Sequence, residues 1–180
     1  MVNKFFINTA LRKVQIENFI KQHFPSEYYS KIEIERTPLG VKIVIYTDRP
    51  GRIIGTGGRK INEMTEVLKT HFNLENPQID VKAIDKPELD ARIVAKRIAS
   101  MLESGYNYKS IGNNMVRDIM KAGAIGVEIV MSGKLGGSKG RVAKFVSGYI
   151  KHCGQPAKDL VDYGFYEAET KPGKIGVKVK

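Results

Sequence analysis

The residues best suited to chemistry in this chain surround Gly55-Thr56-Gly57-Gly58, within the stretch PGRIIGTGGRKI from Pro50 to Ile61. Glycines have no β-carbon, so a ligand can approach the backbone closely, and peptide N–H groups at the start of a following helix can bind phosphate. Arg52 precedes these glycines, and Arg59 and Lys60 follow them. The chemistry indicated is the binding of a phosphate-bearing ligand.

Two familiar glycine patterns do not fit. A P-loop needs a glycine five positions after Gly51, where Thr56 stands, and a dinucleotide fingerprint needs one three positions after Gly57, where Lys60 stands. The pattern that fits is GxxG, with which the KH module holds about four nucleotides of single strand. The alternative is a tight turn with solvated charges. The predicted RNA-binding loop consists of Arg52, Gly55, Thr56, Gly57, Gly58, Arg59 and Lys60.

The elements that must position this loop follow from apolar periodicity. Apolar residues recur at helical spacing in two segments, which predicts two helices. In three other segments apolar and polar residues alternate, which predicts three strands. The expected order is helix 11–24, strands from 31 and 40, the glycine turn, helix 59–72 and strand 77–85.

A boundary is expected at Asp85-Lys86-Pro87, which divides the chain into domains 1–86 and 87–180. The second part predicts two helices followed by strands, with a hairpin turn at Pro172-Gly173. The expected helices are 88–104 and 110–122, and the expected strands are 125–132, 161–169 and 174–180.

Composition favours a polyanionic partner. The 180 residues include 30 Lys and Arg against 19 Asp and Glu, a net charge of +11 and a pI near 9.7. The absence of Trp and of a polybasic run beside an apolar stretch disfavours a membrane partner. No secretory signal is visible, and the single Cys153 suits a reducing cytoplasm. His23, His71 and His152 lack ligand spacing, so no metal or cofactor is expected.

Two further basic regions are candidates for RNA contact. The helix from Ser110 has an apolar side and a basic side, and the basic side includes Lys109, Arg117 and Lys121. The segment 129–158 contains no acid, and its glycines allow close approach of a phosphate backbone. A solvated helix face and a mobile loop are the alternatives. The RNA-binding residues expected in the acid-free segment are Lys134, Lys139, Arg141 and Lys144.

The sequence gives little evidence for a catalytic site. His152 and Cys153 are sequence neighbours and would point to opposite faces of an extended segment. Asp159 and Asp162, or the acids between Asp85 and Asp90, could hold a nuclease metal, but a strand end and a helix N-terminus explain them better.

Three separated blocks carry a family resemblance: the KH stretch from Arg36 to Val81, "AGAIGVEIVMSGKLGG" and "GKIGVKVK". Together they resemble the S-three family of small-subunit ribosomal proteins, of archaeal and eukaryotic type. The resemblance implies a type II KH domain followed by a two-layer α/β domain with a mostly antiparallel or mixed sheet, hence an α+β protein. The family usually has two successive arginines where this chain has Lys109-Ser110, so the positive charge there is reduced.

The resemblance implies a cytoplasmic, non-enzymatic constituent of the head of the small ribosomal subunit. Its partners would be small-subunit ribosomal RNA, messenger RNA and neighbouring head proteins. Lys109, Arg117 and Lys121 would line the channel through which messenger RNA enters. The alternatives are a nucleic-acid enzyme of the DNA-repair lyase type and a free-standing KH regulator of messenger RNA.

Overall fold

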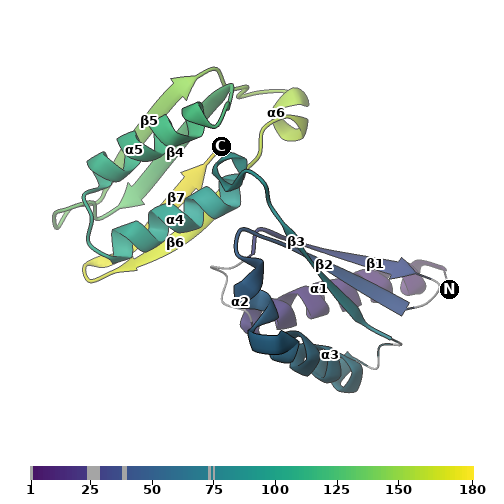
Figure 1. The fold of residues 1–180 in the computed structure, drawn as a ribbon. Helices are drawn as coiled ribbons and strands as arrows, with labels where there is room; N and C mark the ends of the chain where they lie inside the picture. The colour runs from purple at the N-terminus through teal and green to yellow at the C-terminus, as the bar shows by residue number, and fades with distance from the viewer. Residues whose placement is uncertain (1, 24–28, 38–39, 73, 75) are drawn as a thin grey trace. The chain divides into compact units, whose positions relative to one another are not determined.

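The computed structural model describes residues 2–23, 29–37, 40–72, 74 and 76–180. The chain forms two compact units, Met1–Asp85 and Lys86–Lys180, and each has its own hydrophobic core (Figure 1). Phe24 and Pro38, at which the sequence predicts a helix end and a turn, lie outside the described residues. No helix within the described ranges has both the length and the apolar character that crossing a membrane requires.

The first unit packs helices against a three-stranded sheet of order β1-β2-β3, in which β1 and β2 are antiparallel and β2 and β3 are parallel. Its core joins Ile16 and Ile20 of the first helix to Ile43 and Ile45 of the central strand, and to Leu68. The elements are α1 Val2–His23, β1 Lys31–Thr37, β2 Gly40–Thr47, α2 Pro50–Ile54, the 3-10 turn η2 Thr56–Gly58, α3 Arg59–Phe72 and β3 Gln78–Ala83.

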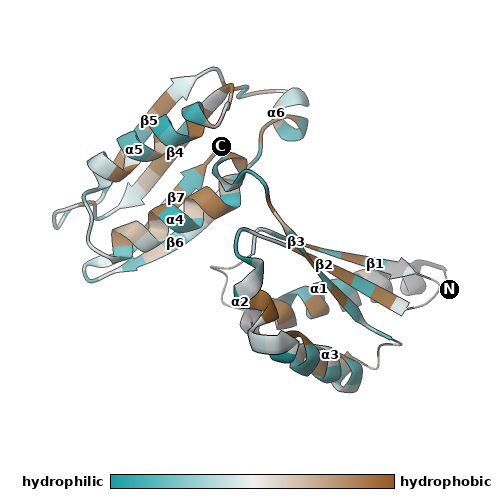
Figure 2. Cartoon of the chain, viewed as in Figure 1, coloured by the Kyte–Doolittle hydropathy of each residue, from teal (hydrophilic) through white to brown (hydrophobic). Residues whose placement is uncertain are grey.

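The second unit lays two helices on a four-stranded antiparallel sheet of order β5-β4-β7-β6. The two helices cover one face of this sheet (Figure 2), and the buried core between them includes Ala95, Ala99, Ile129 and Val177. The elements are the 3-10 turn η3 Pro87–Leu89, α4 Ala91–Glu103, α5 Tyr108–Lys121, β4 Gly126–Gly133, β5 Arg141–Gly148, α6 Pro156–Asp159, β6 Gly164–Thr170 and β7 Gly173–Val179.

The predicted fold class, a KH domain followed by a second α+β unit, is confirmed. Several details differ from the sequence expectations. Strand β5 was not predicted, α1 is longer than expected and leaves Val14 53% exposed, and Leu89 lies before α4 rather than in it. Helix α4 begins after Asp90, whose Oδ1 accepts hydrogen bonds from the N–H groups of Arg92 and Ile93.

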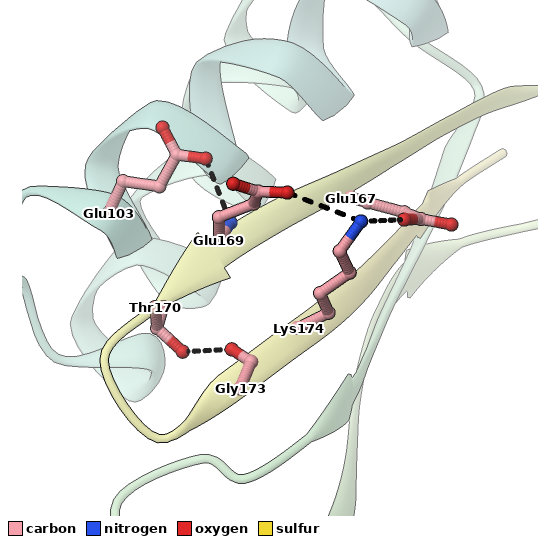
Figure 3. Close-up of polar contacts among 6 residues, drawn as sticks. All are labelled: Glu103, Glu167, Glu169, Thr170, Gly173 and Lys174. Atoms are coloured by element: carbon pink, nitrogen blue, oxygen red, sulfur yellow. Dashed lines mark hydrogen bonds and ion pairs between the residues drawn. The ribbon is translucent and has the colours of Figure 1, made fainter.

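The predicted hairpin between β6 and β7 is present, but its two-residue turn is Lys171-Pro172 rather than Pro172-Gly173, because Thr170 pairs with Gly173. Beside it, Lys174 Nζ lies 3.2 Å from a carboxylate oxygen of Glu169 and 3.5 Å from one of Glu167 (Figure 3). Glu169 and then Glu167 raise the pKa of Lys174 above its usual value, by hydrogen bonding and by charge. The three exposed side chains therefore form an ion-pair cluster across the hairpin.

Candidate nucleic-acid interface

The predicted RNA-binding loop lies at the tip between α2 and α3. The side chain before it, Ile53, is fully buried and fixes α2 to the core. The N–H of Gly55 donates to the Gly51 carbonyl at 3.0 Å, which closes the short helix. Thr56 and Gly57 then lie exposed at the turn, so a ligand can reach their backbone.

Three glycines of the loop need their freedom of backbone rotation. Gly55, Gly57 and Gly58 have φ of +72°, +65° and +75°, a region that other residues rarely adopt. Around Gly57 and Gly58 no atom lies within 4 Å of where a β-carbon would be. A side chain at these two positions would therefore not collide with the rest of the protein. Glycine is favoured there by the backbone conformation, and it leaves the backbone open to a ligand.

Two basic residues of this loop lie at the N-terminus of α3, the end of a helix that normally disfavours positive charge. Helix α3 begins with Arg59-Lys60 and has no acid in its first turn. The positive end of a helix dipole normally favours acids, and a cation there costs about 0.3–1 kcal/mol. Arg59 and Lys60 are exposed. An anion bound at the loop would offset this repulsion.

Helix α5 repeats the same arrangement. Asn107 Oδ1 accepts a hydrogen bond from the Lys109 N–H at 3.0 Å and caps the helix, which leaves Lys109 in a first turn without acids. The helix buries Ile111, Met115 and Ile119 as the sequence predicts. Its opposite side exposes Lys109, Arg117 and Lys121.

The three basic residues of α5 are spread along it. Lys109 and Lys121 are separated by about 18 Å, from twelve residues at the rise of an α-helix. Lys121 lies in the last turn, where a cation stabilises the helix dipole in any protein. Lys109, by contrast, lies in the first turn, the end at which the helix dipole disfavours a cation.

The acid-free segment contains both a loop and a strand. Lys134 and Lys139 belong to the loop between β4 and β5, which is anchored by the buried side chain of Leu135, and Arg141 begins β5. Lys144 differs from the other three because its Nζ lies 3.3 Å from the buried carboxylate of Glu128. Glu128 is only 5% exposed.

A cavity of about 530 Å³ in the second unit brings together cations that are far apart in the sequence. Lys109, Lys134 and Arg141 all line it, at the meeting of the α4–α5 loop, the β4–β5 loop and the β6–β7 turn. No acid of the described chain is among the lining residues, and the exposed ring of Tyr106 lies at the same cavity. Sequence reasoning missed Tyr106, because nothing in its local pattern links it to the basic loop.

The candidate metal-binding acids have structural roles. Asp90 caps α4, and Asp162 Oδ2 accepts a hydrogen bond from the Ala91 N–H at 2.8 Å. Asp159 accepts one from Gln155 within the short helix α6. Within the described residues, no three His, Cys, Asp or Glu side chains gather as a metal site would require.

Comparison with known proteins agrees with this geometry. A family model described as KH domain matches residues 15–89, and one described as ribosomal protein S3, C-terminal domain, matches residues 98–180. A protein of Methanocaldococcus jannaschii named small ribosomal subunit protein uS3 is 45% identical over the whole chain and 86% of its own length. This chain belongs to the uS3 family.

Other members of the uS3 family give the same result. Proteins of that name from Methanobrevibacter smithii and Methanoculleus marisnigri are 42% and 40% identical, over 72% and 76% of their own lengths. The resemblance inferred from the three sequence blocks is confirmed. Family membership also confirms the prediction of a non-enzymatic, RNA-binding ribosomal protein.

Proposed function

We propose that this uS3 family member is a structural constituent of the small ribosomal subunit and binds small-subunit ribosomal RNA. The observation that carries the proposal is the pair of helix N-termini, of α3 and α5, that begin with cations and lack acids in their first turns. Each is an unfavourable arrangement for the protein alone and a favourable one for a bound phosphate. Together with the division of the chain into two compact units between Asp85 and Lys86, this supports two RNA-binding units in one chain.

The finer proposal assigns different RNAs to different surfaces. The loop of residues 55–58 would hold a single strand, and Lys134, Lys139 and Arg141 would dock ribosomal RNA. Lys109, Arg117 and Lys121 would line the channel by which messenger RNA enters, on the head of a cytoplasmic ribosome next to other head proteins. The shared cavity of Lys109, Lys134 and Arg141 supports a continuous path between the two RNA surfaces.

Co-sedimentation tests the first part of the proposal. In cell extract, the chain should migrate with small subunits, and a wholly free pool would contradict a structural role. A photocrosslinker placed at Lys109 in assembled subunits then tests the finer assignment. Crosslinks to message support the channel, and crosslinks to ribosomal RNA alone contradict it.

The loop is tested by two matched double variants of the full chain. Thr56→Asp with Gly57→Asp should weaken binding of a short single-stranded RNA by about tenfold or more, because two carboxylates face the phosphates. Thr56→Asn with Gly57→Asn is the control, since Asn and Asp tolerate the left-handed backbone of Gly57 about equally. Affinity would be measured at one fixed salt concentration.

The comparison between the two variants separates charge from backbone strain. If both lose affinity equally, the loop acts through its conformation alone. If neither does, the loop is only a turn and the proposed RNA contact is wrong.

A further inference from the structure

The basic cavity of the second unit has apolar as well as cationic lining. Its apolar part includes three buried core side chains, Leu102, Leu135 and Ile175. Its cations are exposed: Lys109, Lys134 and Arg141. Within the described residues, none of these three cations forms an ion pair with an acid. The cavity therefore offers one surface to apolar groups and another to anionic groups.

The acids beside the lining residues in the chain have contacts of their own. Glu103 follows Leu102, and its Oε1 accepts a hydrogen bond from the Glu169 N–H at 2.9 Å. Glu169 precedes Thr170, and its Oε1 lies 3.2 Å from Lys174 Nζ (Figure 3). The three cations of the lining thus outnumber the acids next to it, and Lys174 offsets part of the acidic charge. This balance of charge favours an anionic occupant.

Tyr106 adds an aromatic surface to the same cavity. Its side chain is 67% exposed, although its backbone is held in place. The Tyr106 N–H donates to the Met101 carbonyl at 3.2 Å, and the next residue, Asn107, caps α5. Sites for unpaired nucleic acid combine these two features, because a base stacks on an aromatic ring while cations neutralise the phosphates on either side.

We propose that this cavity holds one unpaired nucleotide of a bound RNA, with its base stacked on Tyr106 and its flanking phosphates at Lys109, Lys134 and Arg141. A paired base is stacked within its duplex and cannot reach the ring, so the nucleotide must come from a bulge, a loop or an end. The inference rests on the RNA binding proposed above for these cations. It adds a contact to a base where the cations alone contact phosphate.

Two RNA duplexes that differ at one position test the inference on the full chain. Each has about twelve base pairs. One carries a single unpaired adenosine, and the other has an abasic nucleotide at that position, so both present the same phosphates. Duplexes are used because the loop of residues 55–58 is proposed to hold a single strand. The adenosine duplex should bind about tenfold more tightly, as expected for one base stacked on an aromatic side chain.

Variants of Tyr106 connect this preference to the ring. Tyr106→Phe should keep the preference for the adenosine duplex, because the aromatic face remains, and Tyr106→Ser should abolish it. Tyr149→Ser is the matched control and should keep it: Tyr149 is 65% exposed and has Lys151 Nζ 5.5 Å from its ring centroid, but it does not line this cavity. Lys134→Ala should weaken both duplexes by the same factor, because its expected contact is to phosphate.

The outcomes separate this inference from the RNA binding on which it rests. If the unmodified chain binds both duplexes equally, the inference is wrong and the proposed RNA binding stands. If it binds neither, both are contradicted. A preference that survives in Tyr106→Ser, or that disappears equally in Tyr149→Ser, would also overturn the base contact. Thermal melts check folding, and the unmodified chain and Tyr106→Phe decide the question if Tyr106→Ser does not fold.

Discussion

A single buried carboxylate organises the charges on the open side of the second sheet. Glu128 lies near two lysines and a histidine: Lys144 Nζ at 3.3 Å, His152 Nδ1 at 3.6 Å and Lys180 Nζ at 4.0 Å. One of its oxygens, Oε2, has no hydrogen bond within the described residues. Because a buried charge needs compensation, Lys144 has a structural task that the exposed Lys134 and Lys139 lack.

At this scale we expect Lys144→Met to lower the free energy of unfolding by about 1–2 kcal/mol, because Glu128 stays buried with less compensation. Lys139→Met, which removes an exposed lysine of the neighbouring loop, should change it by less than about 0.5 kcal/mol. Urea unfolding measures both. Adding Glu128→Gln to Lys144→Met should recover part of the loss.

Equal effects of the two lysine substitutions would remove the structural role of Lys144. It would then rejoin the proposed RNA-binding set on the same footing as the other three.

At the scale of elements, the first residue of β6, Gly164, lies close against the backbone of Ala91 at the start of α4. A β-carbon on Gly164 would lie 2.1 Å from the Ala91 carbonyl oxygen, at the start of α4. That neighbour is backbone and cannot rotate away. The hydrogen bond from the Ala91 N–H to Asp162 draws the two segments together at the same point.

Gly164→Ala should therefore destabilise the protein by about 3 kcal/mol or more, at the upper end of overpacking costs. The control is Gly137→Ala, because no atom lies within 4 Å of a β-carbon there and its φ is not in the left-handed range. Differential thermal melts of the two variants measure the contrast. A small effect at Gly164 would mean that α4 and β6 can separate without loss.

Elements with one apolar face could be predicted from the sequence, and those with mixed faces could not. Helix α3 begins and ends at the predicted Arg59 and Phe72 because its apolar residues recur on one side. Strand β5 was missed because its apolar residues do not divide by face: Val142 and Val146 are exposed, and Phe145 on the other face is half-buried. In α1, Ile16 and Val14 are both apolar, but only Ile16 is buried.

The candidate sites divide in the same way. The glycine loop is contiguous, so its residues were all identified from local pattern. The cavity of Lys109, Lys134 and Arg141 depends on three loops that only the tertiary fold brings together. The pairing of Lys144 with Glu128 is likewise a cross-strand contact, which depends on the register of a strand that was not predicted.

At the scale of the whole molecule, the positive charge is unevenly distributed. Residues 86–180 contain 17 Lys and Arg against 9 Asp and Glu, a net charge of +8, whereas residues 1–85 contain 13 against 10. Binding that neutralises phosphates releases counterions, so the more basic unit should dominate the salt dependence of RNA affinity. The glycine loop belongs to the first unit, whose net charge is small, so it should contribute a local contact and little of the salt dependence.

The last prediction concerns this division between the units. The triple variant Lys134→Ala, Lys139→Ala and Arg141→Ala should bind ribosomal RNA more weakly, with a slope of log affinity against log salt shallower by about 2–3 units. It should keep the affinity of the loop for a short single strand, because Thr56 and Gly57 are untouched. The control removes three exposed lysines at Lys69, Lys86 and Lys178, which changes the net charge equally.

The two triple variants separate local contact from total charge. If the control flattens the slope as much, RNA affinity depends on net charge alone and the acid-free segment is a solvated loop. If the test variant weakens binding without changing the slope, the substitutions have damaged the fold, which a thermal melt would detect. A change of slope confined to the test variant would mean that residues 134–141 contact phosphate directly, because counterion release counts the phosphates neutralised and not the charge of the protein.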